Sequence, residues 1–310
     1  MIHYLEHKNI DFAKWDQCIH RAVNRNVFAN SWYLDIVSPA WDALVEDDYD
    51  VVFPLTHNRK FGISYLFQPF FTQQLGVFSD RHLTEALVDR FLEAIPRNFL
   101  FIQINLNTLN KVDVERYSVI MRLNYELDLI HPYPKLAWGY NQNTRRNLRK
   151  AIEQNLPVKR KVEPDELIKL FSENFGRKEG KLKYRNYETL RQLMDHCLKN
   201  TFSRIIGVYS ADDTLCAGAF LLHDQDRIIF HFAASNAAAR ENGAMFLLVD
   251  SVIRESAGKS MIFDFEGSVD ENVARFYKGF GAQELTYPQV TLSRMPRILE
   301  NTVNFVKKIR

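Results

Sequence analysis

The chain has 310 residues, which is more than one hydrophobic core usually serves, so two domains of roughly 150 residues each are expected. Its 40 Lys and Arg residues are almost balanced by 38 Asp and Glu residues, and the net charge of +2 excludes a general attraction of the whole chain to nucleic acid or membranes. The hydrophobic share of 46% is that of a globular protein and excludes an intrinsically disordered chain.

The cysteines and the N-terminus indicate the compartment. Cys18, Cys197 and Cys216 show neither CxxC nor metal-ligand spacing, and an odd number is a poor disulfide framework, so we expect a reducing compartment. The first ten residues include charged ones, and no apolar run approaches the ~18 residues needed to span a bilayer. We therefore predict a cytoplasmic protein with no membrane span. Because the histidines also lack ligand spacing, no metal is expected.

Residues 1–133 are predicted to form an N-terminal domain of mixed α/β structure. Helical periodicity and short runs rich in Val, Ile, Phe and Tyr alternate along it. The predicted helices are Asp11–His20 and Leu83–Ala94, and the predicted strands are Asp50–Leu55, Ile63–Phe67, Phe99–Ile104 and Met121–Leu127. The prolines of His131–Pro134 lack a backbone donor and favour extended predecessors, so we place the domain boundary there.

Residues 134–310 are predicted to form a C-terminal domain that opens with a basic helix at Asn143–Asn155. Three later strands follow one another through short turns rich in Ser, Asp and Gln, which predicts an antiparallel meander. Helix and strand then alternate to the end of the domain. The predicted strands are Val158–Val162, Arg204–Tyr209, Leu215–His223, Arg227–Ala234, Met261–Phe265 and Leu285–Leu292. One further helix is predicted to begin after Pro164–Asp165, and the others are predicted at Asn186–Leu198, Gly243–Ala257 and Glu271–Lys278.

Four segments of this half resemble signatures of the GNAT acyltransferase superfamily and of its tandem members, the FemAB-like transferases. They are the basic helix Thr144–Ala151, the strand end Ala233–Ser235 that resembles the GNAT cofactor strand, the "DF-G" strand end Asp264–Ser268, and the closing "FK…FG" segment Phe276–Ala282. The resemblance covers most of the chain and is strongest from Trp138 to Pro288. It implies an α/β (α+β) fold of two GNAT-like domains, each a mixed, mostly antiparallel sheet flanked by helices.

The resemblance also implies acyl-CoA, such as acetyl-CoA, as a co-substrate held by the second domain alone. GNAT enzymes cradle the coenzyme A pyrophosphate with a [QR]-x-x-G-x-[GA] loop, whose N–H groups and following helix N-terminus face the anion. Here Arg240–Met245 fits the first four positions, but Met245 stands where a small residue is expected. The alternative is that Gly243 only begins a helix with an apolar core face. The implied donor-binding residues are Ala233, Ala234, Ser235, Arg240, Asn242, Gly243 and Ala244.

Four residues are candidates for catalysis. Tyr277 aligns with the tyrosine that many GNAT enzymes use as general acid toward the leaving thiolate, and Lys278 with the lysine of the FemAB-like signature. Asp264 and Glu266 flank Phe265 at a strand end, so their side chains are expected to point the same way, and one of them could serve as general base. The alternatives are that Tyr277 is a core residue, that Lys278 is solvated and that Asp264 caps the next loop.

Basic residues outside this region are candidates for substrate binding. Arg145 and Arg146 of the basic helix could meet phosphates of a nucleotide-linked acceptor or of tRNA, and the alternative is a solvated helix face. Lys183, Tyr184 and Arg185 loosely resemble the acceptor-binding region of FemAB-like enzymes. His231 is expected to be structural rather than catalytic. No Ser or Cys lies in a nucleophile motif, so we predict direct attack by the amine in a ternary complex.

These observations leave three functions open. The first is an N-acyltransferase that passes an acyl group from acyl-CoA to a small-molecule or cell-wall-precursor amine. The second is an aminoacyl-tRNA-dependent transferase that acts on a peptidoglycan precursor, which the incomplete Arg240–Met245 loop would suit. The third is a non-catalytic binding protein on the same fold. The sequence names neither the acyl group nor the acceptor nor the oligomeric state.

Overall fold

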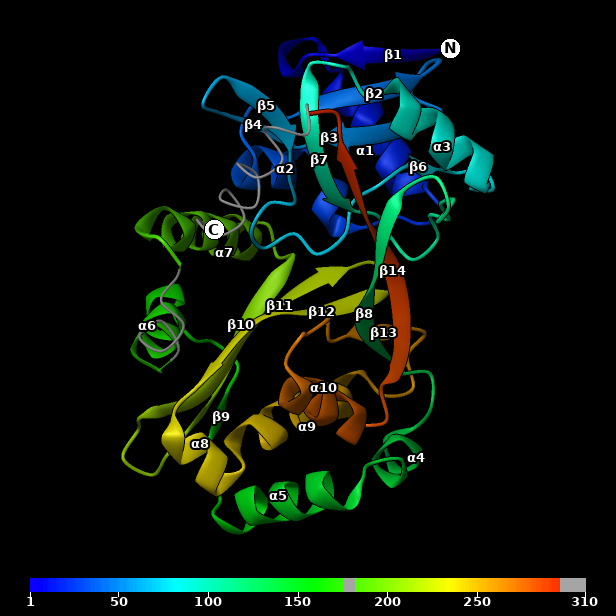
Figure 1. Cartoon of the computed structure of the whole chain (residues 1–310). Coiled ribbons are helices and arrows are strands. Elements are labelled where there is room, and N and C mark those ends of the chain that lie inside the picture. Colours follow the sequence, from blue (N-terminus) through cyan, green and yellow to red (C-terminus); the bar gives the residue numbers. More distant parts are fainter. Residues whose placement is uncertain (175–181, 296–310) are drawn as a thin grey trace. The chain divides into compact units, whose positions relative to one another are not determined.

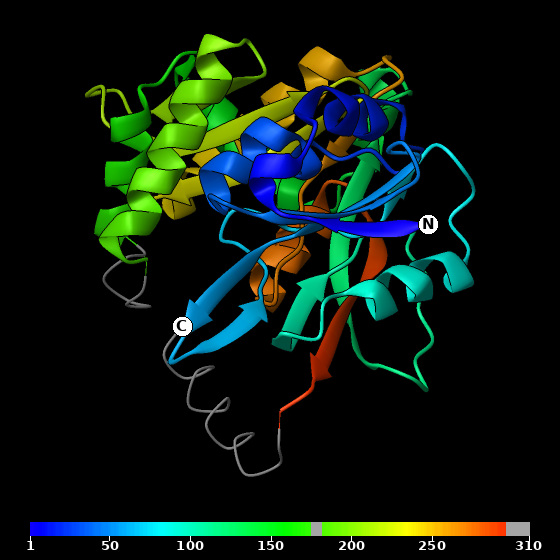
Figure 2. The same cartoon turned by 90° about the horizontal axis from the view of Figure 1, so that it is seen from above.

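The chain divides into two compact units, which are described separately. A computed structural model describes residues 1–174 and 182–295 (Figures 1 and 2). Unit 1 comprises residues 1–122 together with 286–310, and unit 2 comprises residues 123–285. The predicted division at residue 133 differs from these limits, because the chain passes from unit 1 to unit 2 within strand β8 (Ser118–Asp128) and returns within strand β14 (Gln283–Ser293).

Unit 1 is a mixed α/β unit. One sheet has the order β1-β2-β3-β6 and is antiparallel throughout, and further strands follow the order β4-β5-β7-β14. Between β5 and β7 the pairing is parallel. The strands are β1 (Ile2–Leu5), β2 (Asp42–Glu46), β3 (Val51–Leu55), β4 (His57–Lys60), β5 (Ile63–Leu66), β6 (Phe78–Ser79) and β7 (Phe99–Asn105), and the helices are α1 (Phe12–Arg21), α2 (Ser31–Val37) and α3 (Glu85–Ala94), with 3-10 turns at His7–Asn9 and Val27–Ala29.

The helices of unit 1 begin where their caps predict. The Asp11 carboxylate accepts hydrogen bonds from the first free N–H groups of α1, and the Thr84 hydroxyl does the same for α3. On α1 the buried residues Trp15, Cys18 and Ile19 recur at helical spacing, so one face enters the core. Both predicted helices are therefore confirmed to within two residues, as are the predicted strands at β3, β5 and β7.

Unit 2 is built on a sheet with the order β8-β13-β12-β11-β10-β9. The predicted meander is confirmed, because β10, β11 and β12 pair antiparallel, while β12 and β13 pair parallel. The strands are β9 (Val158–Lys159), β10 (Ser203–Tyr209), β11 (Leu215–Asp224), β12 (Arg227–Ser235) and β13 (Ile262–Asp264), and the helices are α4 (Tyr133–Trp138), α5 (Gln142–Glu153), α6 (Pro164–Asn174), α7 (Tyr184–Lys199), α8 (Ala237–Asn242), α9 (Ala244–Ser256) and α10 (Glu271–Gly279).

Two local features of unit 2 differ from the sequence-based expectation. The prolines of residues 131–134 begin a helix that was not predicted, since Pro132 caps α4 and Pro134 lies in its first turn, where a missing N–H costs nothing. A short helix, α8, also precedes α9, and Gly243 joins them with a left-handed φ of +78°. The core between sheet and helices is rich in aromatic side chains, including Phe263, Phe265 and Phe280.

Strand β12 carries an irregularity that positions the site. Phe220 of β11 pairs with Phe232 of β12, whereas the next residue, Leu221, pairs with Phe230. His231 is therefore the extra residue of a β-bulge. Bulges re-aim side chains that regular alternation would send to the other face of the sheet, and Phe230, His231 and Phe232 all line the same cavity.

Candidate active site

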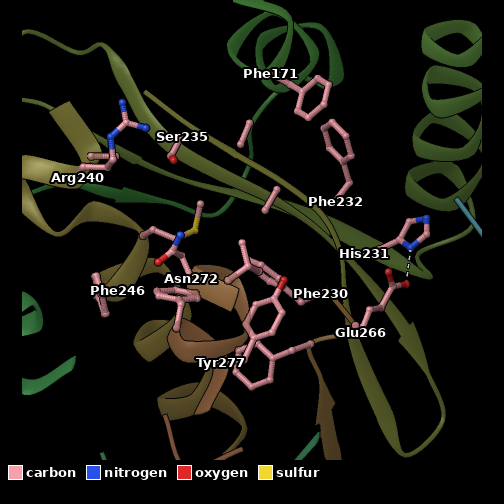
Figure 3. A pocket seen from close by; sticks show the side chains of 18 residues that line it. Phe171, Phe230, His231, Phe232, Ser235, Arg240, Phe246, Glu266, Asn272 and Tyr277 are labelled. Atoms are coloured by element: carbon pink, nitrogen blue, oxygen red, sulfur yellow. Dashed lines mark hydrogen bonds and ion pairs between the residues drawn. The ribbon is translucent and has the colours of Figure 1, made fainter. Parts of the chain in front are cut away.

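A cavity of about 580 Å³ lies within unit 2. Its lining comes from β12, the segment after β13, and helices α6, α8, α9 and α10 (Figure 3). The walls are mostly aromatic and aliphatic, and the polar groups are few, which is the usual composition of a small-molecule site. The labelled polar residues are His231, Ser235, Arg240, Glu266, Asn272 and Tyr277.

Tyr277 presents its hydroxyl to this cavity from α10. Its ring packs against Phe265 at 4.9 Å and Tyr125 at 5.8 Å between centroids, so its orientation is held by its neighbours. Within the part of the chain that the structure describes, the hydroxyl makes no hydrogen bond. Burial, together with the nearby Glu266 carboxylate, raises the pKa of Tyr277 above its ordinary value of 10.0. The phenol therefore keeps its proton at neutral pH and can donate it.

Glu266 faces the same cavity and is paired with a histidine. Its carboxylate oxygen Oε1 lies 2.9 Å from Nδ1 of His231, and the two side chains are 19% and 1% exposed. Burial raises the pKa of Glu266 above its ordinary value of 4.5, and the adjacent His231 opposes this rise. A carboxylate with a raised pKa is a stronger base than an ordinary one, so Glu266 can accept a proton from a bound amine.

Asp264 does not share this cavity, so the prediction that Asp264 and Glu266 point the same way is wrong. Glu266 has a left-handed φ of +58°, which ends the alternation of the strand. Asp264 instead accepts a hydrogen bond from the Glu266 backbone N–H at 2.8 Å and pairs with Arg227 at 2.7 Å. Arg227 also pairs with Glu126 at 2.6 Å. This buried ion cluster supports the loop and leaves Asp264 no free face toward a substrate.

Lys278 also lies outside the cavity lining. Its ammonium group is 2.6 Å from Oε2 of Glu284 and lies over the ring of Tyr125, and its side chain is about half exposed. Because Tyr277 and Lys278 are adjacent on a helix, their side chains point about 100° apart, and here Tyr277 takes the inward direction. Only Tyr277 and Glu266 of the four predicted catalytic residues are brought together.

One end of the cavity is lined by four of the predicted donor-binding residues, Ala233, Ala234, Ser235 and Arg240. Arg240 is exposed and makes no ion pair within residues 1–174 and 182–295. Strands rise about 3.3 Å per residue, so Ser235 lies roughly 13 Å along β12 from His231. Figure 3 shows Arg240 near Ser235 and Glu266 at the opposite end of the view.

The other three predicted donor residues have structural contacts. Asn242 accepts a hydrogen bond from the Ala244 backbone N–H at 2.9 Å, so this N–H is already satisfied. A Cβ on Gly243 would lie 2.3 Å from the Asn147 carbonyl oxygen of α5. A side chain at Gly243 would therefore disturb the packing of α5 against the start of α9, whether or not a donor is bound. Met245, where a small residue was expected, lines the cavity.

The basic residues predicted to bind substrate lie elsewhere. Arg145 and Arg146 are exposed on α5, and their guanidinium groups donate hydrogen bonds to the Trp138 carbonyl and to the Asn143 side chain. Lys183, Tyr184 and Arg185 are exposed at the start of α7. None of these five residues belongs to the cavity lining.

His231 and Phe171 are among the cavity residues that sequence reasoning missed. His231 was assigned a structural role, because a histidine in a strand carries no sign of the bulge that turns it toward Glu266. Phe171 of α6 reaches the cavity and contacts Phe232 at 4.8 Å between ring centroids. The only sequence signal for Phe171 is the helical spacing of apolar residues in α6, and such spacing does not distinguish a residue of a cavity wall from a residue of the hydrophobic core.

Two negative findings hold for the described residues. No group of three or more His, Cys, Asp or Glu side chains could hold a metal ion. No helix there is long and apolar enough to cross a membrane.

Comparison with known proteins identifies the class. Residues 140–278 match the acetyltransferase (GNAT) domain family, and this range contains the whole cavity lining. A comparison with curated proteins gives no match.

Solved structures with the same fold span almost the whole chain. FemX is 12% identical, with a TM-score of 0.61, and the alignment covers 91% of this chain and 96% of FemX. A tandem GNAT protein from the clavulanic acid biosynthesis pathway is 11% identical, with a TM-score of 0.56 and coverage of 96% and 99%. The C-terminal domain of a putative lysylphosphatidylglycerol synthetase from Agrobacterium fabrum is 11% identical, with a TM-score of 0.56 and coverage of 94% and 94%.

The match of the cavity-bearing region to this domain indicates a transferase of acyl groups. Residues 140–278 match the GNAT acetyltransferase domain, and the chain as a whole has the fold of FemX and of the tandem GNAT protein. The predicted fold class, α/β with two GNAT-like domains, is confirmed.

Proposed function

We propose that the protein is an N-acyltransferase that passes the acyl group of acyl-CoA to an amine by direct attack in a ternary complex. The observation that carries this proposal is the meeting of Glu266 and Tyr277 in one cavity of unit 2. One residue can accept a proton and the other can donate one, as amine acylation by a thioester requires.

Each proton has a place to go. Glu266 takes a proton from the acceptor ammonium group, and His231, which is hydrogen-bonded to its carboxylate, keeps that carboxylate oriented. The free amine attacks the thioester carbonyl carbon, the carbon–nitrogen bond forms and the carbon–sulfur bond breaks. Tyr277 then donates its proton to the leaving thiolate, and the second proton that the nitrogen loses as the amide forms restores the Tyr277 phenol. Positioning both reactants between these groups contributes much of the rate.

The Arg240 end of the cavity suits the phosphates of the donor. Arg240 is an exposed cation without an ion pair in the described chain, at the end of β12 that lies farthest from Glu266. A guanidinium group binds phosphate oxygens through two parallel hydrogen bonds. The apolar walls between Arg240 and Tyr277 suit the uncharged arm of the donor. Ala233, Ala234 and Ser235 would flank that arm.

An aminoacyl-tRNA-dependent transfer to a peptidoglycan precursor is the second candidate. One observation favours it, namely that the loop after Arg240 offers a poor pyrophosphate cradle. The Ala244 N–H is bonded to Asn242, and the Met245 side chain occupies the cavity wall. In this case Arg145, Arg146 and the residues 183–185 are proposed to meet phosphates of the tRNA or of the precursor.

The proposal is tested by calorimetric titration of the whole protein with acetyl-CoA and with charged tRNA. We expect acetyl-CoA to bind and Arg240→Ala to weaken the binding by roughly tenfold, the effect of losing one charge-assisted hydrogen-bond partner. Arg275→Ala is the matched control, because Arg275 is an exposed arginine of α10 outside the cavity lining. Binding of charged tRNA alone would transfer the function to the second candidate. Binding of neither would favour a non-catalytic protein.

A further inference from the structure

Helices α4 and α5 form an exposed surface that the cavity does not use. Trp138, the last residue of α4, is 81% exposed. A large aromatic side chain left in water loses the free energy that its burial would provide, roughly 25 cal/mol for each Å² of apolar area. Figure 1 shows α4 and α5 on the side of unit 2 away from β10–β12.

Helix α5, which follows this tryptophan in the chain, carries four cations: Arg145, Arg146, Arg149 and Lys150. All four are exposed, and none has an ion pair within the described residues, although Arg191, Arg204 and Arg227 of the same unit do. The Arg145 guanidinium group donates to the Trp138 carbonyl oxygen, so the charged group lies next to the indole-bearing residue.

The spacing of these cations is costly for the helix alone. Arg145 and Arg149 are four residues apart, as are Arg146 and Lys150, so like charges stand one above the other in two neighbouring rows. Each such pair destabilises a helix by roughly 0.2–0.5 kcal/mol. An anionic partner would remove this repulsion. The opposite face of α5 buries Thr144, Leu148 and Ala151, so the cationic face is fixed outward.

We propose that the surface formed by Trp138 and the four cations of α5, the α4–α5 surface, binds the anionic face of a phospholipid membrane. The charged face of a helix is convex, which suits a plane of headgroups better than the grooved tracks in which single-stranded nucleic acids are held. Basic side chains near an anionic bilayer gain electrostatic energy, and an exposed tryptophan sits at the headgroup level. The surface is a peripheral contact and needs no spanning helix.

The test uses the whole protein and vesicles of phosphatidylglycerol in phosphatidylcholine, with pure phosphatidylcholine vesicles as the uncharged reference. Co-sedimentation measures binding, and tryptophan fluorescence reports the indole. Trp15 and Trp41 are fully buried and Trp32 is partly buried, so Trp138 dominates the solvent-sensitive emission. We expect binding to the anionic vesicles only, a blue shift of the emission, and loss of binding as salt rises.

Two variants make the test specific. Arg149→Gln with Lys150→Gln should weaken vesicle binding about thirtyfold, the factor for about 1 kcal/mol from each of two cations. Trp138→Ala should abolish the blue shift and weaken binding. The matched control is Phe61→Ala, because Phe61 is a 77% exposed aromatic residue of unit 1.

Two results would overturn the proposal. One is failure of the natural protein to bind the anionic vesicles, or binding that neither variant changes. The other is absence of vesicle binding together with salt-dependent binding of an unstructured RNA that both variants weaken, which would assign the α4–α5 surface to nucleic acid.

Discussion

Replacing Tyr277 by Phe removes one oxygen atom and isolates the proposed proton donor. The ring contacts with Phe265, Tyr125 and Phe230 remain, and no hydrogen bond within the described residues is lost. We therefore expect the free energy of unfolding to change by less than about 1 kcal/mol. Loss of a general acid lowers the rate of the chemical step by ~100-fold or more, which corresponds to about 2.7 kcal/mol of barrier.

Single-turnover kinetics with one confirmed donor measures this step directly. Tyr125→Phe is the matched control, since it removes a neighbouring phenol hydroxyl that contacts Glu284 at 3.4 Å outside the cavity lining. Lys278→Met should leave the rate nearly unchanged, because Lys278 pairs with Glu284 rather than facing the cavity. A folded Tyr277→Phe protein with full activity, or a Lys278→Met protein with none, would refute this account of the site.

Three further predictions concern base, backbone and stability. The kcat/KM value should fall as the pH is lowered, with a midpoint above pH 4.5, because Glu266 must be ionised to accept a proton and its pKa is raised. Glu266→Gln should lower kcat/KM ~100-fold and remove this acid limb of the pH profile. Gly243→Ala should destabilise the protein more than Gly258→Ala does, as measured by urea unfolding. Gly243 and Gly258 both have a left-handed φ, which strains an alanine by about 1–2 kcal/mol, but only at Gly243 would the new Cβ also meet a backbone oxygen. Equal losses of stability would contradict this prediction. Burial tends to raise the pKa of Asp42, but hydrogen bonds from His57, Tyr4 and the His7 N–H outweigh it and hold this pKa below 3.8. Asp42→Asn should therefore lower the free energy of unfolding by about 2 kcal/mol at pH 7. The difference between the natural protein and the variant should disappear as the pH falls below 3.8 and through the lowered pKa of Asp42. A difference that stays constant with pH would argue against this prediction.

Local sequence patterns predicted most elements of unit 2, because each has its own period and boundary signals. The helix α10 is an example, since Asp270 accepts a hydrogen bond from the Asn272 N–H and the buried side of the helix includes Tyr277. The strands β10–β12 are apolar and separated by short polar turns, so their antiparallel pairing could also be predicted.

The features that the sequence could not predict arise where segments far apart in the chain come into contact. The inward role of His231 needs the register shift between β11 and β12, which neither strand shows alone. Gly243 fits a phosphate-loop pattern, yet glycine is needed there because the Asn147 carbonyl oxygen, about a hundred residues earlier in the chain, lies too close for any side chain. The strand Leu285–Leu292 was predicted correctly, but not that Gln289 and its neighbours pair with β7 of unit 1.

That pairing has a consequence for biosynthesis. Residues 123–285 interrupt the sequence of unit 1, whose last described strand, β14, aligns Val290 with Ile104. A ribosome releases the chain from its N-terminus, so every residue of unit 2 is made before β7 can receive this strand. Unit 2, which holds the cavity, can therefore form its own contacts first. Until β14 is made, strand β7 of unit 1 has one edge without a partner strand. Such an edge is prone to association with other chains, so a chain that stops near residue 285 would keep its cavity and yet be liable to aggregate.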